Sequence, residues 1–317
     1  MRGPDRLVGS ISGVAGPVMR ALDRHDRGVP GSVRGSDWPL DRARAGSYVL
    51  GRRTPAGGYC FYRTPQWGVE EPNAPDTLAA LECLTLLGID PPEPEATGRW
   101  LQSLQTQDGG YSTFTIGWAT LRALGVLGVQ PSRLPDGWLE RWAEHLLAGR
   151  KPPSDWRAAL THALQLIELL TSMSAGLQPG HRDAFTQLLD VAHGQSGGWM
   201  APGVDLESAG VAVSLISLGR LPGLADPGLA TLLHACEDET FGLRFAPGTG
   251  MTSAGALWGG LTIARALGLP LRYPHAIAAN LALLQREDGG FGRRHTAIST
   301  LHDTWLGVRA ACLLDSG

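Results

Sequence analysis

Two short acidic segments, one near each end of the chain, carry the residue types that acid catalysis needs. The first holds Glu70, Glu71 and Asp76, and the second holds the pair His302-Asp303. A carboxylic acid kept near other carboxylates in an apolar site has a raised pKa and can donate a proton. Asp76 or Asp303, with Glu71 and His302 nearby, would then protonate an alkene or an allylic alcohol. The competing interpretation is that the two aspartates cap helix N-termini.

Aromatic residues lie just before or within several apolar segments and are candidates to line a substrate cavity. An aromatic-lined apolar cavity binds an isoprenoid chain, and each ring that faces a carbocation stabilises it by about 0.5–2 kcal/mol. Trp and Phe at helical spacing also serve as core residues, so we expect about half of the set to reach the cavity. Trp67 and Trp305 are preferred because each lies beside a candidate acid. The full set is Trp67, Trp118, Trp199, Phe245, Trp258 and Trp305.

The elements that position these residues belong to an internal repeat. A turn of small residues followed by an aromatic residue returns roughly every 45 residues, which is the size of one helical hairpin. Amphipathic segments precede several turns, and segments that are apolar nearly all round follow them. The turns lie at 56–59, 108–111, 196–199, 240–242 and 288–291. The amphipathic segments are 95–107, 181–195 and 275–287, and the apolar segments are 74–88, 115–128, 155–170, 206–219, 252–268 and 302–314.

This pattern predicts an all-α fold that is a single (α/α)6 toroid, a closed barrel of six inner and six outer helices. A helix that is apolar nearly all round is buried on both sides, so the apolar segments would form the inner barrel. The toroid domain would span residues 38–317, after an N-terminal extension of residues 1–37 that is partly helical. Because the first and last repeats of a closed ring are neighbours, Asp76 and Asp303 would meet at one rim.

Two motifs resemble those of the squalene-hopene cyclases, within the terpenoid cyclase and protein prenyltransferase superfamily. The turns at 105–111, 193–199 and 285–291 fit Q-x3-G-x-aromatic, with His193 in the Gln position of the second. The segment 57–81 is similar to the one that carries P-D-x-D-D-T-A in these cyclases and in class II diterpene cyclases. The resemblance implies protonation by the middle aspartate. That position is Pro75 here, and of the three aspartates only the third remains, as Asp76.

The protein prenyltransferase β subunits have the same toroid but hold a zinc ion with an Asp-x-Cys pair and a later His. The nearest matches in this chain are Thr252, Ala254 and Leu306, which cannot form that site. We therefore exclude protein prenyltransferase activity and expect no metal or other cofactor. Magnesium would be needed only if the substrate were a diphosphate.

Basic residues after two of the turns are candidates to hold such a diphosphate. Arg244 stands roughly where the prenyltransferase β subunits have a diphosphate-binding arginine, and Arg293 and His295 follow a later turn. Charge-assisted hydrogen bonds from these side chains would bind the phosphate oxygens. The alternative is that arginines near turns are solvated or bind carbonyl groups.

Composition limits the partners. The formal net charge is −3, with 27 Lys and Arg against 30 Asp and Glu, so nucleic acid is not an expected partner. Four scattered cysteines indicate a reducing cytoplasm, and no apolar run approaches the ~20 residues of a membrane span. Contact with a membrane would be peripheral.

Two functions from different classes remain open. The first is a terpene cyclase-like enzyme that cyclises, isomerises or dehydrates an isoprenoid or other apolar polyene in a central funnel. The second is a non-catalytic toroid that binds an isoprenoid or a partner and has lost the catalytic acid. In either case the open mouth of a solitary toroid is a surface that a lipid, a homodimer or a partner protein would cover.

Overall fold

The computed structural model describes residues 39–61, 70–147, 155–172, 177–201, 203–224 and 226–315. This part of the chain is mostly helical, and its strands are two-residue segments that form two antiparallel ladders. The prediction of an all-α fold is therefore confirmed. The extension predicted for residues 1–37 and the candidate residue Trp67 lie outside the described residues.

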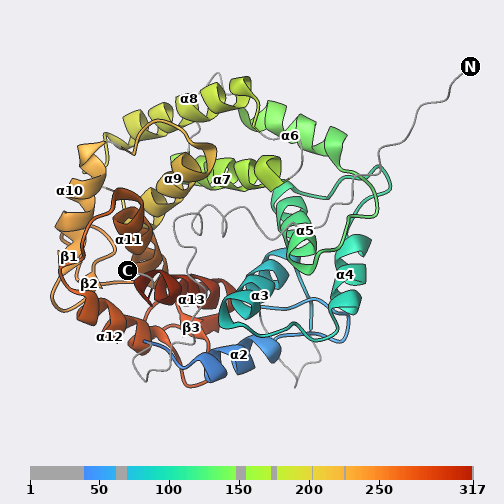
Figure 1. Ribbon diagram of the computed structural model, residues 1–317, viewed down its shortest axis with the longest axis horizontal. Helices are drawn as coiled ribbons and strands as arrows, with labels where there is room; N and C mark the ends of the chain where they lie inside the picture. The colour runs from blue at the N-terminus through green and yellow to red at the C-terminus, as the bar shows by residue number, and fades with distance from the viewer. Residues whose placement is uncertain are drawn as a thin grey trace, which may run out of the picture.

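Inner and outer helices alternate along the chain (Figure 1). The inner helices agree with the predicted apolar segments to within two residues at each end. They are α3 (Ala74–Leu87), α5 (Phe114–Leu127), α7 (Trp156–Ser172), α9 (Leu206–Gly219), α11 (Ala254–Leu267) and α13 (Leu301–Asp315). The outer helices are α2 (Arg42–Leu50), α4 (Pro94–Ser103), α6 (Asp136–Leu147), α8 (Pro179–Ser196), α10 (Pro227–Cys236) and α12 (Pro274–Leu284). The strands are β1 (Glu237–Asp238), β2 (Gly242–Leu243), β3 (Phe291–Gly292) and β4 (Ser299–Thr300).

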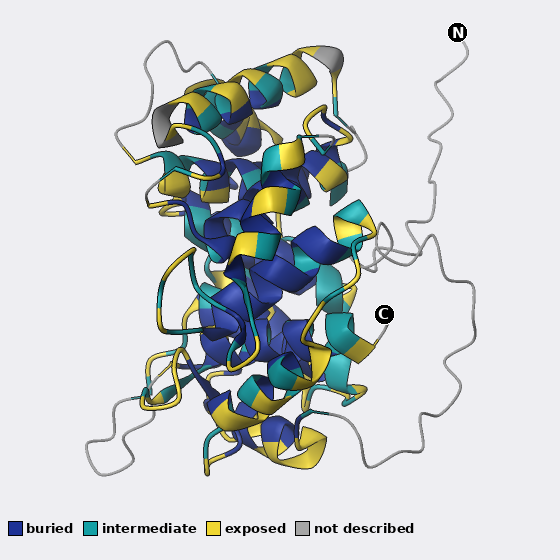
Figure 2. Cartoon of the chain, turned by 90° about the vertical axis from the view of Figure 1, so that its left-hand side faces the viewer, coloured by how far each residue is buried: buried dark blue, intermediate teal, exposed yellow. Residues whose placement is uncertain are grey.

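The inner helices contact one another in a circular order. Each of them packs against the next inner helix along the chain, and the last, α13, packs against the first, α3 (Figure 1). Each outer helix contacts an inner helix that is adjacent to it in sequence. Figure 2 shows the result, with buried residues concentrated on the inner helices and exposed residues on the outer ones. Within the described ranges, no helix has the length and apolar character needed to cross a membrane.

Polar side chains start the inner helices at equivalent positions. Asn73, Thr113, Asp205 and Ser253 each accept a hydrogen bond from the backbone N–H three residues later. Thr300 does the same for α13. The capping interpretation of the two candidate acids is therefore wrong, because Asp76 and Asp303 are the residues whose N–H groups are capped. Their carboxylates remain available for other contacts.

The polar residue of the repeated turn motif has a structural role that its position explains. The Gln105 side chain donates to the carbonyl oxygens of Gly109 and Arg133 and accepts from the Arg133 N–H at 2.9 Å. Gln285 makes the equivalent bonds to Gly289 and Asp41, which joins the last outer helix to the first across 244 residues. Each glutamine thus ties its own turn to the residue that leads into the next outer helix.

His193, the third member of this motif, makes a similar connection with different chemistry. Its Nε2 lies 3.5 Å from a carboxylate oxygen of Asp226, the residue that caps the next outer helix, α10. The Trp199 indole N–H of the same turn donates to Asp226 at 2.9 Å. Histidine therefore replaces glutamine without loss of the link between consecutive repeats.

Two glycines allow α9 and α11 to approach closely. A Cβ atom on Gly259 would lie 2.0 Å from the carbonyl oxygen of Leu206, and one on Gly210 would lie 2.5 Å from the Gly259 Cα. Both clashes are with backbone atoms, which cannot rotate away. The two helices can keep this separation only if both positions lack a side chain.

We expect Gly259→Ala to lower the free energy of unfolding by about 1–3 kcal/mol, because the new methyl group must push α9 and α11 apart. Urea titration followed by circular dichroism would measure the change. Gly194→Ala is the matched control, since a Cβ at that exposed helical position meets nothing within 4 Å. Equal stability of the two variants would contradict the close approach.

Candidate functional site

Five charged or titratable residues lie near the N-terminal ends of the inner helices, and we call them the rim cluster. Four belong to the first turns of α3, α9 and α13, and the fifth follows β3. Contact between α13 and α3 brings the first and last inner helices together here. The rim cluster consists of Asp76, Glu207, Arg293, His302 and Asp303.

Asp76 is the member whose environment best suits a proton donor. It is only 8% exposed, and burial raises the pKa of its carboxyl group. The Asn73 amide donates to the carboxylate at 2.5 Å, and a backbone hydrogen bond from Phe61 and the charges of His302 and Arg52 oppose the shift. The same groups would stabilise the carboxylate after it had lost a proton.

Asp303 occupies the equivalent place on α13. It is also 8% exposed and accepts a hydrogen bond from the Thr300 hydroxyl at 2.8 Å. Its neighbour His302 is exposed, and the imidazole ring lies 5.7 Å from the Trp305 ring. The histidine can therefore reach solvent and a substrate at the rim.

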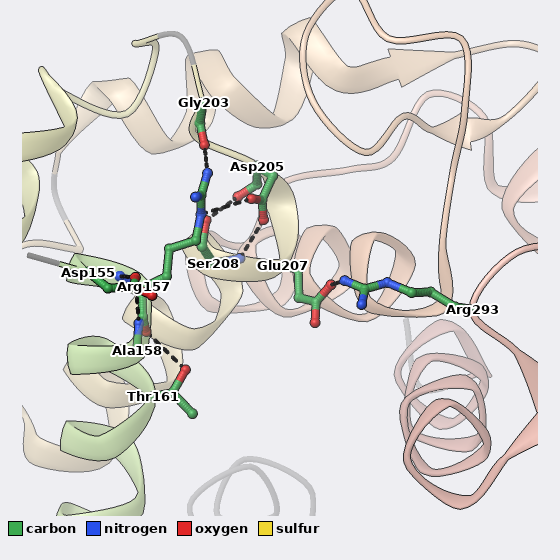
Figure 3. Close-up of polar contacts among 9 residues, drawn as sticks. All are labelled: Asp155, Arg157, Ala158, Thr161, Gly203, Asp205, Glu207, Ser208 and Arg293. Atoms are coloured by element: carbon green, nitrogen blue, oxygen red, sulfur yellow. Dashed lines mark hydrogen bonds and ion pairs between the residues drawn. The ribbon is translucent and has the colours of Figure 1, made fainter.

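Glu207, a residue not selected from the sequence, extends the rim cluster on α9. Its carboxylate pairs with Arg293 at 3.4 Å (Figure 3). The side chain lies over Gly255, where a Cβ atom would come within 2.3 Å of a carboxylate oxygen. Burial raises the pKa of Glu207, Arg293 and His302 lower it, and the negative charges of Asp205 and Asp303 raise it further. Glu207 and the two candidate acids thus belong to one electrostatic system.

A cavity of about 170 Å³ opens beside Glu207, between α7 and α9. Arg157 borders it and pairs with Asp205 at 3.4 Å, while its guanidinium also donates to the Gly203 carbonyl (Figure 3). Asp155 caps the start of α7 at the same edge. The cavity is therefore apolar on one side and charged on the other. Its lining residues are Arg157, Leu160, Thr161, Asp205, Glu207, Ser208, Val211, Phe245 and Arg293.

A second polar group lies deeper, halfway along the inner helices, and we call it the central network. Glu82 of α3 accepts from Arg122 of α5 at 2.7 Å and from the Trp305 indole of α13 at 2.7 Å. Each of its carboxylate oxygens therefore has one donor. Glu82 and Arg122 also form an ion pair that is mostly buried. The central network consists of Glu82, Trp118, Arg122, Glu168, Trp305 and Arg309.

Glu168 and Arg309 complete the central network without contacting each other directly. Glu168 of α7 accepts from the Trp118 indole of α5 at 2.7 Å. Burial raises the pKa of Glu168, and the charges of Arg122 and Arg309 oppose that shift. The Arg309 guanidinium lies over two tryptophan rings, with its central carbon 4.6 Å from the Trp305 centroid and 5.0 Å from that of Trp258. The network thus connects four consecutive inner helices, from α13 through α3 and α5 to α7, and Arg309 also contacts Trp258 of α11.

This arrangement changes the role expected for the tryptophans. Trp258 and Trp305 each already present a ring face to the guanidinium of Arg309. The Trp118 and Trp305 indoles are fixed by carboxylates. A carbocation at the level of the central network would meet the positive charges of Arg122 and Arg309, which disfavour it. Carbocation chemistry is therefore better placed at the rim than among these rings.

The other residues selected from the sequence lie apart from one another. Trp199 is in the turn between α8 and α9, where it contacts His193 and donates to Asp226. Arg244 pairs with Asp238 within the β1–β2 ladder. Phe245 borders the cavity beside Glu207. Glu71 and the side chain of His295 are exposed. Of the aromatic set, Phe245 is the member that lines the described cavity.

The position of three charged residues in the repeat could have indicated the central network from the sequence. Glu82, Arg122 and Arg309 each stand nine residues after the cap of an otherwise apolar helix. A charged residue in the middle of such a helix needs a partner on a neighbouring helix. The recurrence at one position in three repeats shows that the partners lie at one level.

No protein-family model matches the chain, and the search of curated proteins gives no match. Among the described residues, no group of three or more His, Cys, Asp and Glu side chains is arranged to hold a metal ion.

We expect Arg122→Met to lower the free energy of unfolding by about 3–5 kcal/mol, because it leaves the buried Glu82 without its cation. Arg99→Met is the matched control, since Arg99 forms an exposed pair with Glu95 at 4.0 Å that contributes at most about 1 kcal/mol. Urea titration of both variants would compare them. Similar small losses would show that the central network is not needed for stability.

Glu168 predicts a pH dependence of stability. Because its pKa is raised in the folded state, the folded protein binds this proton more tightly than the unfolded chain does. The stability from this group is present below the unfolded value of 4.5 and is lost as pH rises through the folded pKa. Glu168→Gln keeps an acceptor for Trp118 but cannot titrate, so its stability relative to the native protein should increase as pH rises from 4.5. Unfolding free energies at a series of pH values would test this, and a constant difference would contradict it.

Proposed function

We propose that this protein is a terpene cyclase-like enzyme that protonates an isoprenoid or other apolar polyene at the rim cluster. The observation that carries the proposal is Asp76, a buried carboxyl group with a raised pKa in the first turn of α3. A second buried aspartate, Asp303, lies in the first turn of α13, the inner helix that packs against α3. A raised pKa keeps an acid protonated closer to neutral pH, where it can act as a general acid. We assign the activity to the lyases or intramolecular transferases of this class, and not to the zinc prenyltransferases.

We further propose that the fold is a single (α/α)6 toroid related to the terpenoid cyclase and prenyltransferase superfamily. The circular order of contacts among the inner helices supports this assignment. The glutamine motif supports it independently, because Gln105 and Gln285 connect successive repeats in the same way. Residues 38–317 would constitute the toroid. A cytoplasmic location agrees with the four cysteines, all in the described ranges, which form no disulfide.

In the proposed reaction Asp76 transfers its proton to one carbon of an alkene, and the alkene π electrons form the new C–H bond. The Asn73 amide, the Phe61 N–H and His302 then stabilise the Asp76 carboxylate. A neighbouring double bond can attack the cation, which forms a ring C–C bond and leaves the positive charge on another carbon. Loss of a proton from the carbon next to the charge then forms a new double bond and ends the cation. The rim carboxylates, Asp303 among them, can accept that proton, so no oxidant or metal enters the balance.

A non-catalytic binding toroid is the second candidate, and the central network favours it. Glu82, Arg122, Glu168 and Arg309 place formal charges between the inner helices, where a cyclase would need apolar surface. Burying charged groups next to a hydrocarbon is unfavourable. In this case the ligand would be bound and released unchanged.

We expect Asp76→Asn to reduce product formation by about 10²-fold or more, the usual contribution of a general acid. Purified protein would be incubated with farnesyl diphosphate, geranylgeranyl diphosphate and squalene, and products would be identified by mass spectrometry. Asp303→Asn tests the second carboxylate, and Asp190→Asn on the exposed face of α8 is the matched control. Substrate that is retained by the native protein but never converted would instead favour the binding toroid.

A further inference from the structure

The central network contains more hydrogen-bond donors than acceptors. Glu82 already accepts from Arg122 and Trp305, one donor for each oxygen. Among the described residues, no carboxylate lies within ion-pair distance of Arg309. Its guanidinium instead makes cation–π contacts with the rings of Trp258 and Trp305. A guanidinium carries five N–H donors in a planar fork. The N–H groups of Arg309 are therefore available to a species outside the described residues.

Two further donors, one beside Arg309 and one within the central network, are buried without an acceptor. The indole N–H of Trp258 and the Nε of Arg122 have no hydrogen-bond partner among the described residues. Trp258 is 4% exposed and Arg122 is 9% exposed, so bulk water does not readily supply the acceptor. A buried donor without a partner costs about 1–3 kcal/mol, which makes such groups rare in native proteins. Both donors would be satisfied by a hydrogen-bond acceptor.

The surroundings restrict the kind of acceptor. Trp258 and Trp305 flank the guanidinium, so a ligand that reaches Arg309 must also fit against aromatic surface. Arg309, Trp305 and Glu82 are only partly buried, which leaves this place open to a ligand. A planar carboxylate matches the fork of a guanidinium through two parallel hydrogen bonds. A dianionic phosphate would be repelled more strongly by the nearby charges of Glu82 and Glu168.

We propose that the central network is a binding site for the carboxylate group of an apolar carboxylic acid, held by Arg309 between Trp258 and Trp305. This site is separate from the acid at the rim. Arg309 follows Asp303 by six residues on α13, which corresponds to ~9 Å along a helix at 1.5 Å per residue. The apolar part of the ligand would extend from Arg309 toward the rim cluster. The proposal does not require that the protein catalyse a reaction.

Calorimetric titration with matched pairs of ligands tests this site. Farnesoic acid and farnesol share one apolar body and differ in the carboxylate, as do octanoate and octanol. We expect the native protein to bind each acid at least about tenfold more tightly than its alcohol, since one charge-assisted hydrogen bond is worth that much. Equal affinities for acid and alcohol, or no binding of either acid, would overturn the proposal.

Three variants locate the site. Arg309→Met should remove the preference for the acid, while Arg99→Met on the outer surface should retain it. Glu168→Gln removes the negative charge that interacts with Arg309 and should tighten binding of the acid several-fold. If Arg309→Met does not fold, the test rests on Glu168→Gln. An unchanged affinity of that variant for the acids would contradict the proposed site. Asp76→Asn should bind the acids normally, which separates this proposal from the proposed catalysis.

Discussion

The packing of α13 against α3 is the contact on which the rest of the structure depends. It joins segments more than two hundred residues apart, and the hydrogen bond from Trp305 to Glu82 crosses this junction with 223 residues between its ends. Loop closure over such a length costs entropy that only the completed set of contacts can offset. Without this contact, Asp76 and His302 would not interact, and Glu82 would be a buried carboxylate with one donor fewer. Both the rim cluster and the central network therefore exist only when the first and last inner helices meet.

The central network and the rim cluster show how the environment gives carboxyl groups different properties. Glu82 has a donor on each oxygen and a guanidinium beside it, an arrangement that stabilises a buried charge. At Asp76, burial outweighs the hydrogen bonds from Asn73 and Phe61 and the nearby positive charges, so the pKa of the carboxyl group is raised. Glu82 thus joins α3 to α5 and α13. We propose that the chemistry takes place at the rim and that the centre recognises the ligand.

Placing charged groups between apolar helices costs free energy, because the charges lose their hydration. Replacing such groups with well-packed apolar residues is often neutral or stabilising, so their presence needs a reason beyond stability. Arg309 supplies one, because its guanidinium lies against two tryptophans instead of a carboxylate. The pairing of Arg122 with Glu82 leaves Arg309 available for something that is not part of the chain. We propose that the polar centre serves recognition, while the close approach at Gly210 and Gly259 holds α9 against α11.

The sequence by itself determined the helices and their alternation. The repeat of small-residue turns, the apolar segments and the polar residues at their starts gave the inner helices to within two residues, because these signals are local. The sequence also identified Gln105, Gln285 and His193 as equivalent, although their partners Arg133, Asp41 and Asp226 became known only from the folded chain. The tertiary structure alone decided which side chains meet. In the sequence, Asp76 and Asp303 could be either acids or helix caps, and Glu207, Glu82 and Arg309 were not selected. Burial and pairing depend on helices that are far apart along the chain.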